Sequence, residues 1–201
     1  MTQIAPPRYA FDLSTDFHWS IERYLQAIAT GTLDENDRVE LIFGKIIEKI
    51  PIYSPNSACI TKLQRFFRRL DDRYLLRTEN PVILPNDSMP EPDGAVVAYQ
   101  DDLYASYHPT NKETYLIIEA ADSSLDRDRT IKMVAYALAG IPEYWIVNIR
   151  DRRLEVHHSP DTTSGTYMNI NHYEEDATVD SPFAAAVRVA DLLPAVSKAQ
   201  S

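Results

Sequence analysis

The feature that most restricts the fold of this chain is one continuous block, residues 115–149. It starts with "YLIIEAA", a run of apolar, β-branched and aromatic residues that predicts a buried strand. The segment "LDRDRTIKMVAYALAG" then predicts a helix whose apolar stripe consists of Ile131, Val134, Ala135 and Leu138. A further apolar run, "IPEYWIVNI", predicts a second strand. Because two strands joined by a crossover helix pair in parallel, the block predicts a sheet with at least one helix packed on it.

Shorter patterns precede this block. A helix is expected over residues 14–31, with Ser14, Thr15 or Asp16 as its cap. The alternating segment "RVELIFGKIIEKI" follows and breaks at Gly44, which is typical of a β-hairpin. The chain therefore begins with a helix and a hairpin rather than with the sheet itself.

A second helix is indicated by Leu63, Phe66, Phe67 and Leu70, which lie on one face at helical spacing. Four more segments predict strands: "NPVILP", "DGAVVAY", "RRLEVHHS" and "GTYMNINHYEE". A short C-terminal helix is expected in "VRVADLLPAV". This mixed order predicts an α/β (α+β) fold, a mixed β-sheet flanked by helices, with the N-terminal helix and hairpin added to it.

The composition is that of one globular domain. The chain has 201 residues, of which 44% are hydrophobic and 25% charged, so we expect a single domain over 14–196 between an arm at 1–13 and a tail at 197–201. No apolar run approaches the ~20 residues that cross a bilayer, and the N-terminus has no secretory pattern, so a cytoplasmic protein without a membrane partner is expected. One cysteine, Cys59, permits neither an internal disulfide nor a cysteine metal cluster.

The net charge of −10 counts against non-specific binding to nucleic acid, which is itself an anion. Residues 61–77 differ from the rest, because they carry six basic and two acidic side chains. Lys62, Arg65, Arg69 and Arg73 can form a stripe there that faces phosphate groups. The alternative is an ordinary solvated helix face.

Three carboxylates fall in segments that predict strands: Glu40, Asp93 and Glu119. A carboxylate among apolar strand residues is unfavourable unless it is paired, hydrogen-bonded or bound to a metal. Each has an ordinary explanation when taken alone: a cross-hairpin ion pair for Glu40, a turn for Asp93, and a solvated strand end for Glu119. Taken together, they predict one site, since Asp93 begins a strand and Glu119 lies near the end of the next strong one.

Carboxylates that converge repel one another, so the predicted site requires a cation. Oxygen ligands of this kind select Mg²⁺, which keeps most of its waters and is often bound together with phosphate. Lys132, one turn into the helix after Glu119, can place an ammonium group at the same point because its long side chain runs along the core. The alternative for Lys132 is a surface pair with Asp128 at i, i+4.

Three segments of the sequence resemble a known protein family. "PEPDGAVV" and "LIIEAADSSLDRDRTIKMVAYALAGIPEYWIVN", preceded by "VELIFGKIIE", are similar to the Uma-two-type endonucleases, also catalogued as domain of unknown function family 820 within the PD-(D/E)XK restriction-endonuclease-like superfamily. The resemblance covers roughly residues 17–195. It implies a Mg²⁺-dependent endonuclease that hydrolyses DNA, with Mn²⁺ as a substitute metal and a homodimer as the assembly.

The resemblance also implies roles for particular residues. Asp93 and Glu119 would hold the metal with the backbone carbonyl of Ala120, Glu40 would act as an outer acid, and Lys132 would stabilise charge on the hydroxide or phosphate. The sequence departs from the superfamily pattern at Ala121, where a lysine is usual two residues after the second acid. Lys132 matches the position from which this family supplies that cation instead.

Two alternatives belong to other classes of function. One is a catalytically degenerate nuclease-fold module that binds nucleic acid or a protein, which the residue at 121 and the acidic composition favour. The other is a hydrolase with two carboxylates, such as a glycosidase, for which no motif is present. Metal dependence separates all three.

Overall fold

A six-stranded mixed sheet forms the centre of the computed structural model, which describes residues 17–34, 36–51, 53–183 and 186–195. Its strands, in spatial order, are β3 (Tyr74–Arg77), β4 (Gly94–Ala98), β5 (Thr114–Ala121), β6 (Glu143–Asn148), β7 (Arg153–Asp161) and β8 (Thr166–Glu174). The neighbours β5 and β6 are parallel, while the other four pairs are antiparallel. The parallel pair predicted from the strand, helix and strand block is thereby confirmed.

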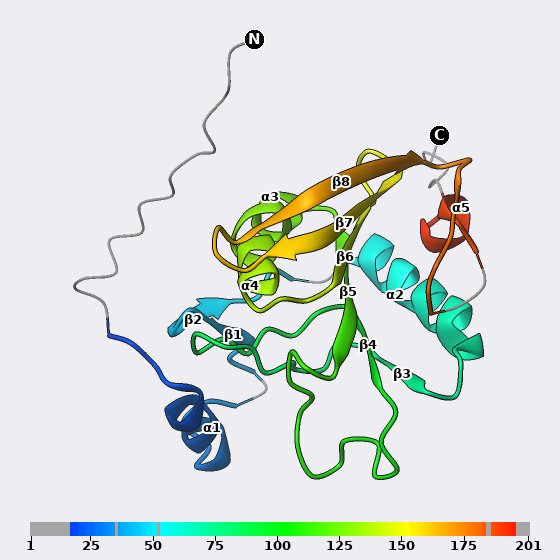
Figure 1. Ribbon diagram of the computed structural model, residues 1–201. Coiled ribbons are helices and arrows are strands. Elements are labelled where there is room, and N and C mark those ends of the chain that lie inside the picture. The colour runs from blue at the N-terminus through cyan, green and yellow to red at the C-terminus, as the bar shows by residue number, and fades with distance from the viewer. Residues whose placement is uncertain (1–16, 35, 52, 184–185, 196–201) are drawn as a thin grey trace.

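Helices cover both faces of this sheet (Figure 1). On one face lie α2 (Ser54–Phe66), the 3₁₀ turn η1 (Phe67–Arg69) and α5 (Val189–Leu192). On the other lie α3 (Leu125–Arg127), the π-helical turn η2 (Asp128–Lys132) and α4 (Met133–Leu138). The remaining elements are α1 (Ile21–Ala29), the hairpin β1 (Val39–Ile42) with β2 (Lys45–Glu48), and the pair β9 (Thr178–Val179) with β10 (Val187–Arg188). This is the predicted class, a mixed sheet flanked by helices.

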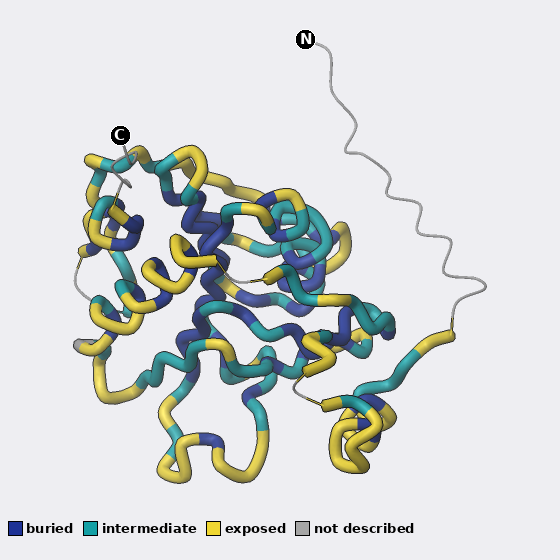
Figure 2. The backbone as a smooth tube through the Cα atoms, turned by 180° about the vertical axis from the view of Figure 1, so that it is seen from behind, coloured by how far each residue is buried: buried dark blue, intermediate teal, exposed yellow. Residues whose placement is uncertain are grey.

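The sheet separates two apolar clusters, because alternate side chains of a strand point to opposite faces. Leu63 of α2 and Trp145 of β6 belong to the cluster under α2 and α5. Ala135 of α4 and Ile146 of β6 belong to the cluster under α4. Figure 2 shows the buried stretches running through the centre of the molecule. The sheet core therefore supports the residues at the start of β4 and at the end of β5, which are neighbours in the sheet.

Several predicted element boundaries are corrected by the structure. The first helix starts after Ser20, whose hydroxyl accepts a hydrogen bond from the Arg23 amide, and the caps expected at 14–16 lie outside the described residues. The hairpin turns at Phe43 and Gly44, both with positive φ, as a tight two-residue turn requires. The predicted arm (1–13) and tail (197–201) also fall outside the described residues.

One strand prediction was wrong, and one strand of the sheet was not predicted. "NPVILP" forms only isolated bridges, at Ile83 and Leu84, because it runs past the sheet as a connection rather than along it. The edge strand β3 was not predicted at all, since its four residues are only partly buried and follow a helical pattern without a clear break.

The predicted apolar stripe of the helix after β5 is confirmed only in part. Ala135 is buried and Ile131 packs, partly buried, against the same apolar cluster, whereas the charged residues Asp128 and Lys132 are buried as well. The cause is the π turn, which inserts an extra residue into one turn and shifts the phase of the side chains. Two charged groups consequently face the sheet.

Candidate active site

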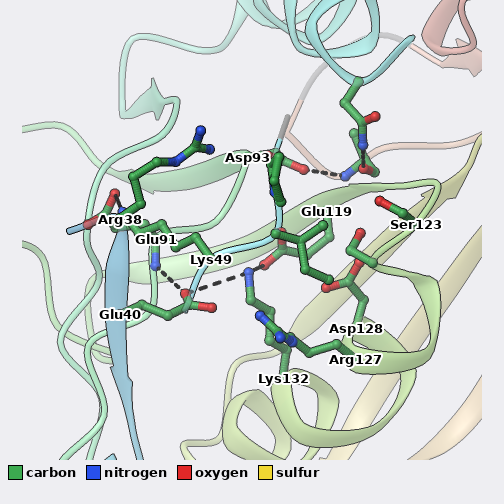
Figure 3. Close-up of a pocket in the computed structure, with 15 residues that line it drawn as sticks. Arg38, Glu40, Lys49, Glu91, Asp93, Glu119, Ser123, Arg127, Asp128 and Lys132 are labelled. Carbon is green, nitrogen blue, oxygen red and sulfur yellow. Dashed lines mark hydrogen bonds and ion pairs between the residues drawn. The ribbon is translucent and has the colours of Figure 1, made fainter. Parts of the chain in front are cut away.

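The antiparallel register of β4 and β5 brings two of the predicted acids, Asp93 and Glu119, together. Gly94 pairs with Ile118, so Asp93, just before β4, lies beside the end of β5 that carries Glu119. The Asp93 Oδ2 accepts a hydrogen bond of 2.6 Å from the Ala120 amide. Both acids line one pocket of about 90 Å³, shown in Figure 3. This volume is well above the roughly 10–15 Å³ that one water needs, so the pocket has room for water molecules.

The π turn η2 supplies the cation of this pocket. Lys132 is only 8% exposed, and its Nζ lies 2.9 Å from Glu119 Oε1 and 3.7 Å from Glu40 Oε2 (Figure 3). The Tyr136 hydroxyl, one turn further along in α4, donates a second hydrogen bond of 2.8 Å to the same Glu119 oxygen. Glu119 is therefore fixed from two positions of one helical segment.

Glu40 reaches the pocket from the hairpin, in strand β1. It is 2% exposed, and its Oε2 accepts a hydrogen bond of 3.2 Å from the Glu91 amide. The structure thus brings together Glu40, Asp93, Glu119 and Lys132, which are far apart in sequence.

The electrostatics of the pocket follow from removing carboxylates from water. Burial raises the pKa of Asp93 to about 6 and raises the pKa of Glu119 well above its ordinary value, although Lys132 opposes both shifts. Burial alone would lower the pKa of Lys132, but Glu119, Glu40 and two further carboxylates raise it. The ammonium is therefore held in its charged form in a site with an excess of acids.

Asn56 and Asp128 are among the pocket residues that sequence reasoning missed. The Asn56 Nδ2 donates a hydrogen bond of 2.6 Å to the Ala120 carbonyl, and its Oδ1 is buried without a hydrogen-bond partner among the described residues. Asp128 is 1% exposed, its Oδ2 also lacks such a partner, and burial raises its pKa. The i, i+4 spacing of Asp128 and Lys132 was the only signal in the sequence; nothing local marked Asn56.

These residues match the donor set of a magnesium ion. Among the described residues, no group of three or more histidine, cysteine, aspartate or glutamate side chains is arranged to hold a metal. Mg²⁺ needs fewer protein ligands, because it keeps several waters and is usually bound by one or two carboxylates. Asp93 and Glu119 are the residues that would provide these carboxylates, and the buried oxygens of Asn56 and Asp128 without hydrogen-bond partners can accept hydrogen bonds from waters. The pocket therefore fits a hydrated ion held by two carboxylates.

The predicted basic stripe lies away from this pocket. The Lys62 Nζ donates to the Ala190 carbonyl of α5 at 3.2 Å, and Arg73 forms an ion pair of 2.8 Å with Asp71. Arg65 is exposed on α2, and the Arg69 side chain lies outside what the structure describes.

Three other cationic side chains line the pocket with Lys132. They are Arg38, Lys49 and Arg127. Lys49 pairs with Glu91, and Arg127 donates a hydrogen bond of 2.6 Å to the Glu48 carbonyl. The partners in these contacts lie in β2 and in the segment just before β4. The cations at the pocket are therefore brought together by tertiary structure and do not lie on one face of a single helix, as the predicted stripe would.

Comparison with known proteins identifies a matching family and a solved structure with a similar fold. A family model, Uma2, described as "Putative restriction endonuclease", matches residues 21–190. A solved structure from Anabaena variabilis, described as a putative nuclease belonging to DUF820, superposes with a TM-score of 0.62 at 17% identity. That match covers 86% of this chain and 96% of the other. No curated protein matches the chain. No helix within the described ranges is long and apolar enough to span a membrane.

Proposed function

Because this chain belongs to the Uma2 family, whose description is "Putative restriction endonuclease", we propose that it is a Mg²⁺-dependent endonuclease of the PD-(D/E)XK type that hydrolyses phosphodiester bonds of DNA. One observation carries the proposal: Asp93, Glu119 and Lys132 converge in a single pocket. Two acids that can hold a metal ion and one amine that can stabilise charge on phosphate are a set of groups suited to phosphodiester hydrolysis.

Asp93 and Glu119 are the proposed metal ligands, with the Ala120 carbonyl beside them. Mg²⁺ bound there, or Mn²⁺ in its place, supplies a water of lowered pKa and neutralises charge on a phosphate oxygen. Asn56 holds the Ala120 carbonyl by a hydrogen bond, and so fixes the third oxygen of the set.

Lys132 is the proposed electrophilic group. Its ammonium is held by Glu119 and Glu40 inside the pocket, where the shortage of water strengthens its attraction for a phosphate oxygen. Glu40 serves as the outer acid that keeps the ammonium charged and aimed. The position of this lysine favours a catalytic site over the degenerate module that Ala121 suggested.

The acidic body of the protein requires a local attraction for DNA. Arg38 and Arg127 at the pocket provide it close to the scissile bond, while Lys62, Arg65, Arg69 and Arg73 would contact the backbone further away. Salt screens charges beyond about 8–10 Å, which weakens the repulsion between DNA and the acids remote from the pocket.

The decisive experiment is cleavage of plasmid DNA by the purified protein with Mg²⁺ or Mn²⁺. Asp93→Asn should lower the rate at least 100-fold, because it removes a ligand charge, whereas Asp101→Asn, at an exposed position in the turn after β4, should leave it unchanged. Cleavage that survives Asp93→Asn would identify a contaminant and end the proposal.

Calorimetry with Mn²⁺ separates the nuclease from the degenerate module. The proposed enzyme should bind Mn²⁺, and Glu119→Gln should abolish that binding. Wild-type protein that binds no Mn²⁺ would favour the module. Cutting both strands of a duplex in one binding event uses two such sites, so a homodimer is part of the proposal, and light scattering of the purified protein tests it.

A further inference from the structure

Lys132 is delivered to the pocket by an unusual piece of backbone. The π turn η2 links two short helices of three and six residues, α3 and α4. A π turn is rare, and it occurs mostly as a single turn inserted into an α-helix, frequently at functional sites. The contacts that this turn makes with the sheet therefore bear on where Lys132 lies.

The register of the sheet supplies two acids for such contacts. Glu119 of β5 pairs with Ile146 of β6, and Ile146 pairs with Glu155 of β7. The three residues form one row across adjacent strands, and their side chains share the face on which η2 packs. Glu119 and Glu155 are both buried, 3% and 1% exposed, on either side of a fully buried isoleucine.

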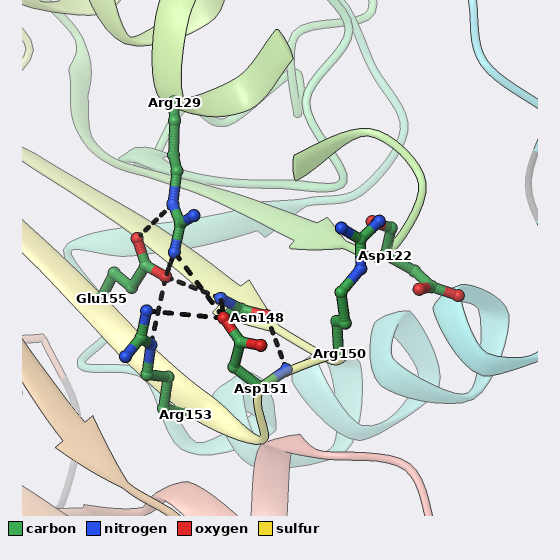
Figure 4. Close-up of polar contacts among 7 residues, drawn as sticks. All are labelled: Asp122, Arg129, Asn148, Arg150, Asp151, Arg153 and Glu155. Carbon is green, nitrogen blue, oxygen red and sulfur yellow. Dashed lines mark hydrogen bonds and ion pairs between the residues drawn. The ribbon is translucent and has the colours of Figure 1, made fainter. Parts of the chain in front are cut away.

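The π turn is tied to both acids. Lys132 contacts Glu119 at 2.9 Å. Arg129, three residues earlier, makes a two-point contact with Glu155, with its Nε 3.0 Å from Oε2 and its terminal nitrogen bonded to Oε1 (Figure 4). The turn therefore spans the row with one basic side chain on each acid.

The Glu155 end of this arrangement is fixed in turn. Asn148 donates a hydrogen bond of 2.8 Å to Glu155 and one of 2.9 Å to Asp151, and its own oxygen accepts from the Asp151 amide. Arg153 lies 3.5 Å from Glu155 on the other side. Burial alone would raise the pKa of Glu155, but Arg129 and Asn148 hold it below its ordinary value. Glu155 is thus a charged, immobile anchor.

We propose that Arg129 and Glu155 are a positioning pair that holds the π turn in register and so places the Lys132 ammonium beside Glu119. Neither residue lines the pocket. Without the pair, the turn loses its fixed register and opens more often, and a change of one residue in phase rotates side chains by about 100°. The pair lies outside the pocket but positions one of its proposed catalytic groups. Only the effect on the cleavage rate depends on the proposed function; the effect on the backbone of the turn does not.

Hydrogen exchange of the full chain tests the placement without reference to activity. Arg129→Lys keeps the charge but loses the two-point contact, and should accelerate amide exchange in peptides covering 128–135 at least tenfold. The matched control is Arg152→Lys, because Arg152 makes a similar two-point contact with Glu175 away from the pocket. It should leave those peptides unchanged. Unaltered exchange at 128–135 in Arg129→Lys would overturn the proposal.

A mutant cycle tests whether the pair acts through Lys132. Arg129→Lys should lower kcat about tenfold in the wild-type background, with little change in KM, and should have no further effect in a Lys132→Gln background. Additive losses would indicate a general structural role and contradict the proposal. If Arg129→Lys does not fold, Glu155→Gln replaces it in both measurements. A folded wild type that cleaves no DNA would refute the nuclease while leaving the exchange result to decide the positioning.

Discussion

At the residue scale, the site depends on keeping buried charges partnered. Glu119 has two partners, the Lys132 ammonium and the Tyr136 hydroxyl, both on the same carboxylate oxygen. A buried charge that loses a partner is penalised more than a neutral group, because its desolvation is no longer compensated. The chemistry of this pocket therefore also determines how much its residues contribute to stability.

Replacing Tyr136 tests that relation. Tyr136→Phe removes a donor to a buried carboxylate and should lower the free energy of unfolding by about 2 kcal/mol, as is typical of hydrogen bonds to charged groups. Tyr167→Phe is the matched control, since that buried hydroxyl donates to a neutral acceptor, the Ile141 carbonyl, at 3.0 Å. Its cost should be about 1 kcal/mol. Urea unfolding measures both, and equal losses would show that the charge of Glu119 has no special weight.

At the element scale, the hairpin β1–β2 is a functional part because it delivers Glu40. Its turn packs closely against the segment before α1. The Gly44 amide donates to the Asp87 carbonyl at 2.8 Å, and Asp87 also holds His18 at 2.7 Å. A side chain at position 44 would meet the His18 ring at 2.2 Å. The N-terminal segment and the hairpin are thereby fitted to each other.

Two glycines allow this fit to be measured. Gly44 and Gly31 have nearly the same φ, +69° and +70°, but an added Cβ at Gly31 would meet nothing within 4 Å. Both alanine variants share the strain of a positive φ, about 1 kcal/mol. Gly44→Ala must also displace His18 from Asp87, so it should be the more destabilising by about a further 1 kcal/mol. Thermal unfolding compares the two, and identical melting temperatures would exclude the contact as a source of stability.

At the scale of the whole molecule, stability depends on pH through groups that lie outside the pocket as well as in it. His157 of β7 is buried between Tyr144 and Tyr167, and neither ring nitrogen has a hydrogen-bond partner among the described residues. Burial lowers its pKa to about 4. Between that value and the ordinary one near 6.5, the unfolded chain binds a proton that the folded chain does not. Stability from this residue is therefore present at neutral pH and is lost as the pH falls.

His157→Phe should remove that dependence. At pH 5, the shift of the His157 pKa corresponds to about 2 kcal/mol of lost stability, which the variant recovers relative to its own value at pH 7.5. Burial of Asp93 acts in the opposite direction, because its raised pKa favours the folded form in acid, so only the difference between the two proteins isolates His157. Urea unfolding of both from pH 5 to pH 7.5 measures it, and parallel curves would contradict the prediction.

The sequence by itself determined the elements with strong local patterns and the identity of the acids. The strands around Glu119 and Trp145 follow from continuous apolar runs, the hairpin from an alternating pattern, and the helix around Leu63 from a period of 3.6 residues. The chain carries all of these patterns locally. Asp93 and Glu119 could be selected because a carboxylate within an apolar run is unfavourable without a partner. These inferences need no knowledge of distant parts of the chain.

Only the tertiary structure decided which distant groups meet. Asn56 enters the pocket because α2 packs against the end of β5, and Lys62 of the predicted stripe is engaged by α5. The burial of Asp128 and Lys132 depends on a π turn that contacts with the sheet stabilise, against the preference of the local sequence for a regular helix. Strand register and helix phase are set by the sum of many weak long-range contacts, and no short stretch of sequence contains that sum.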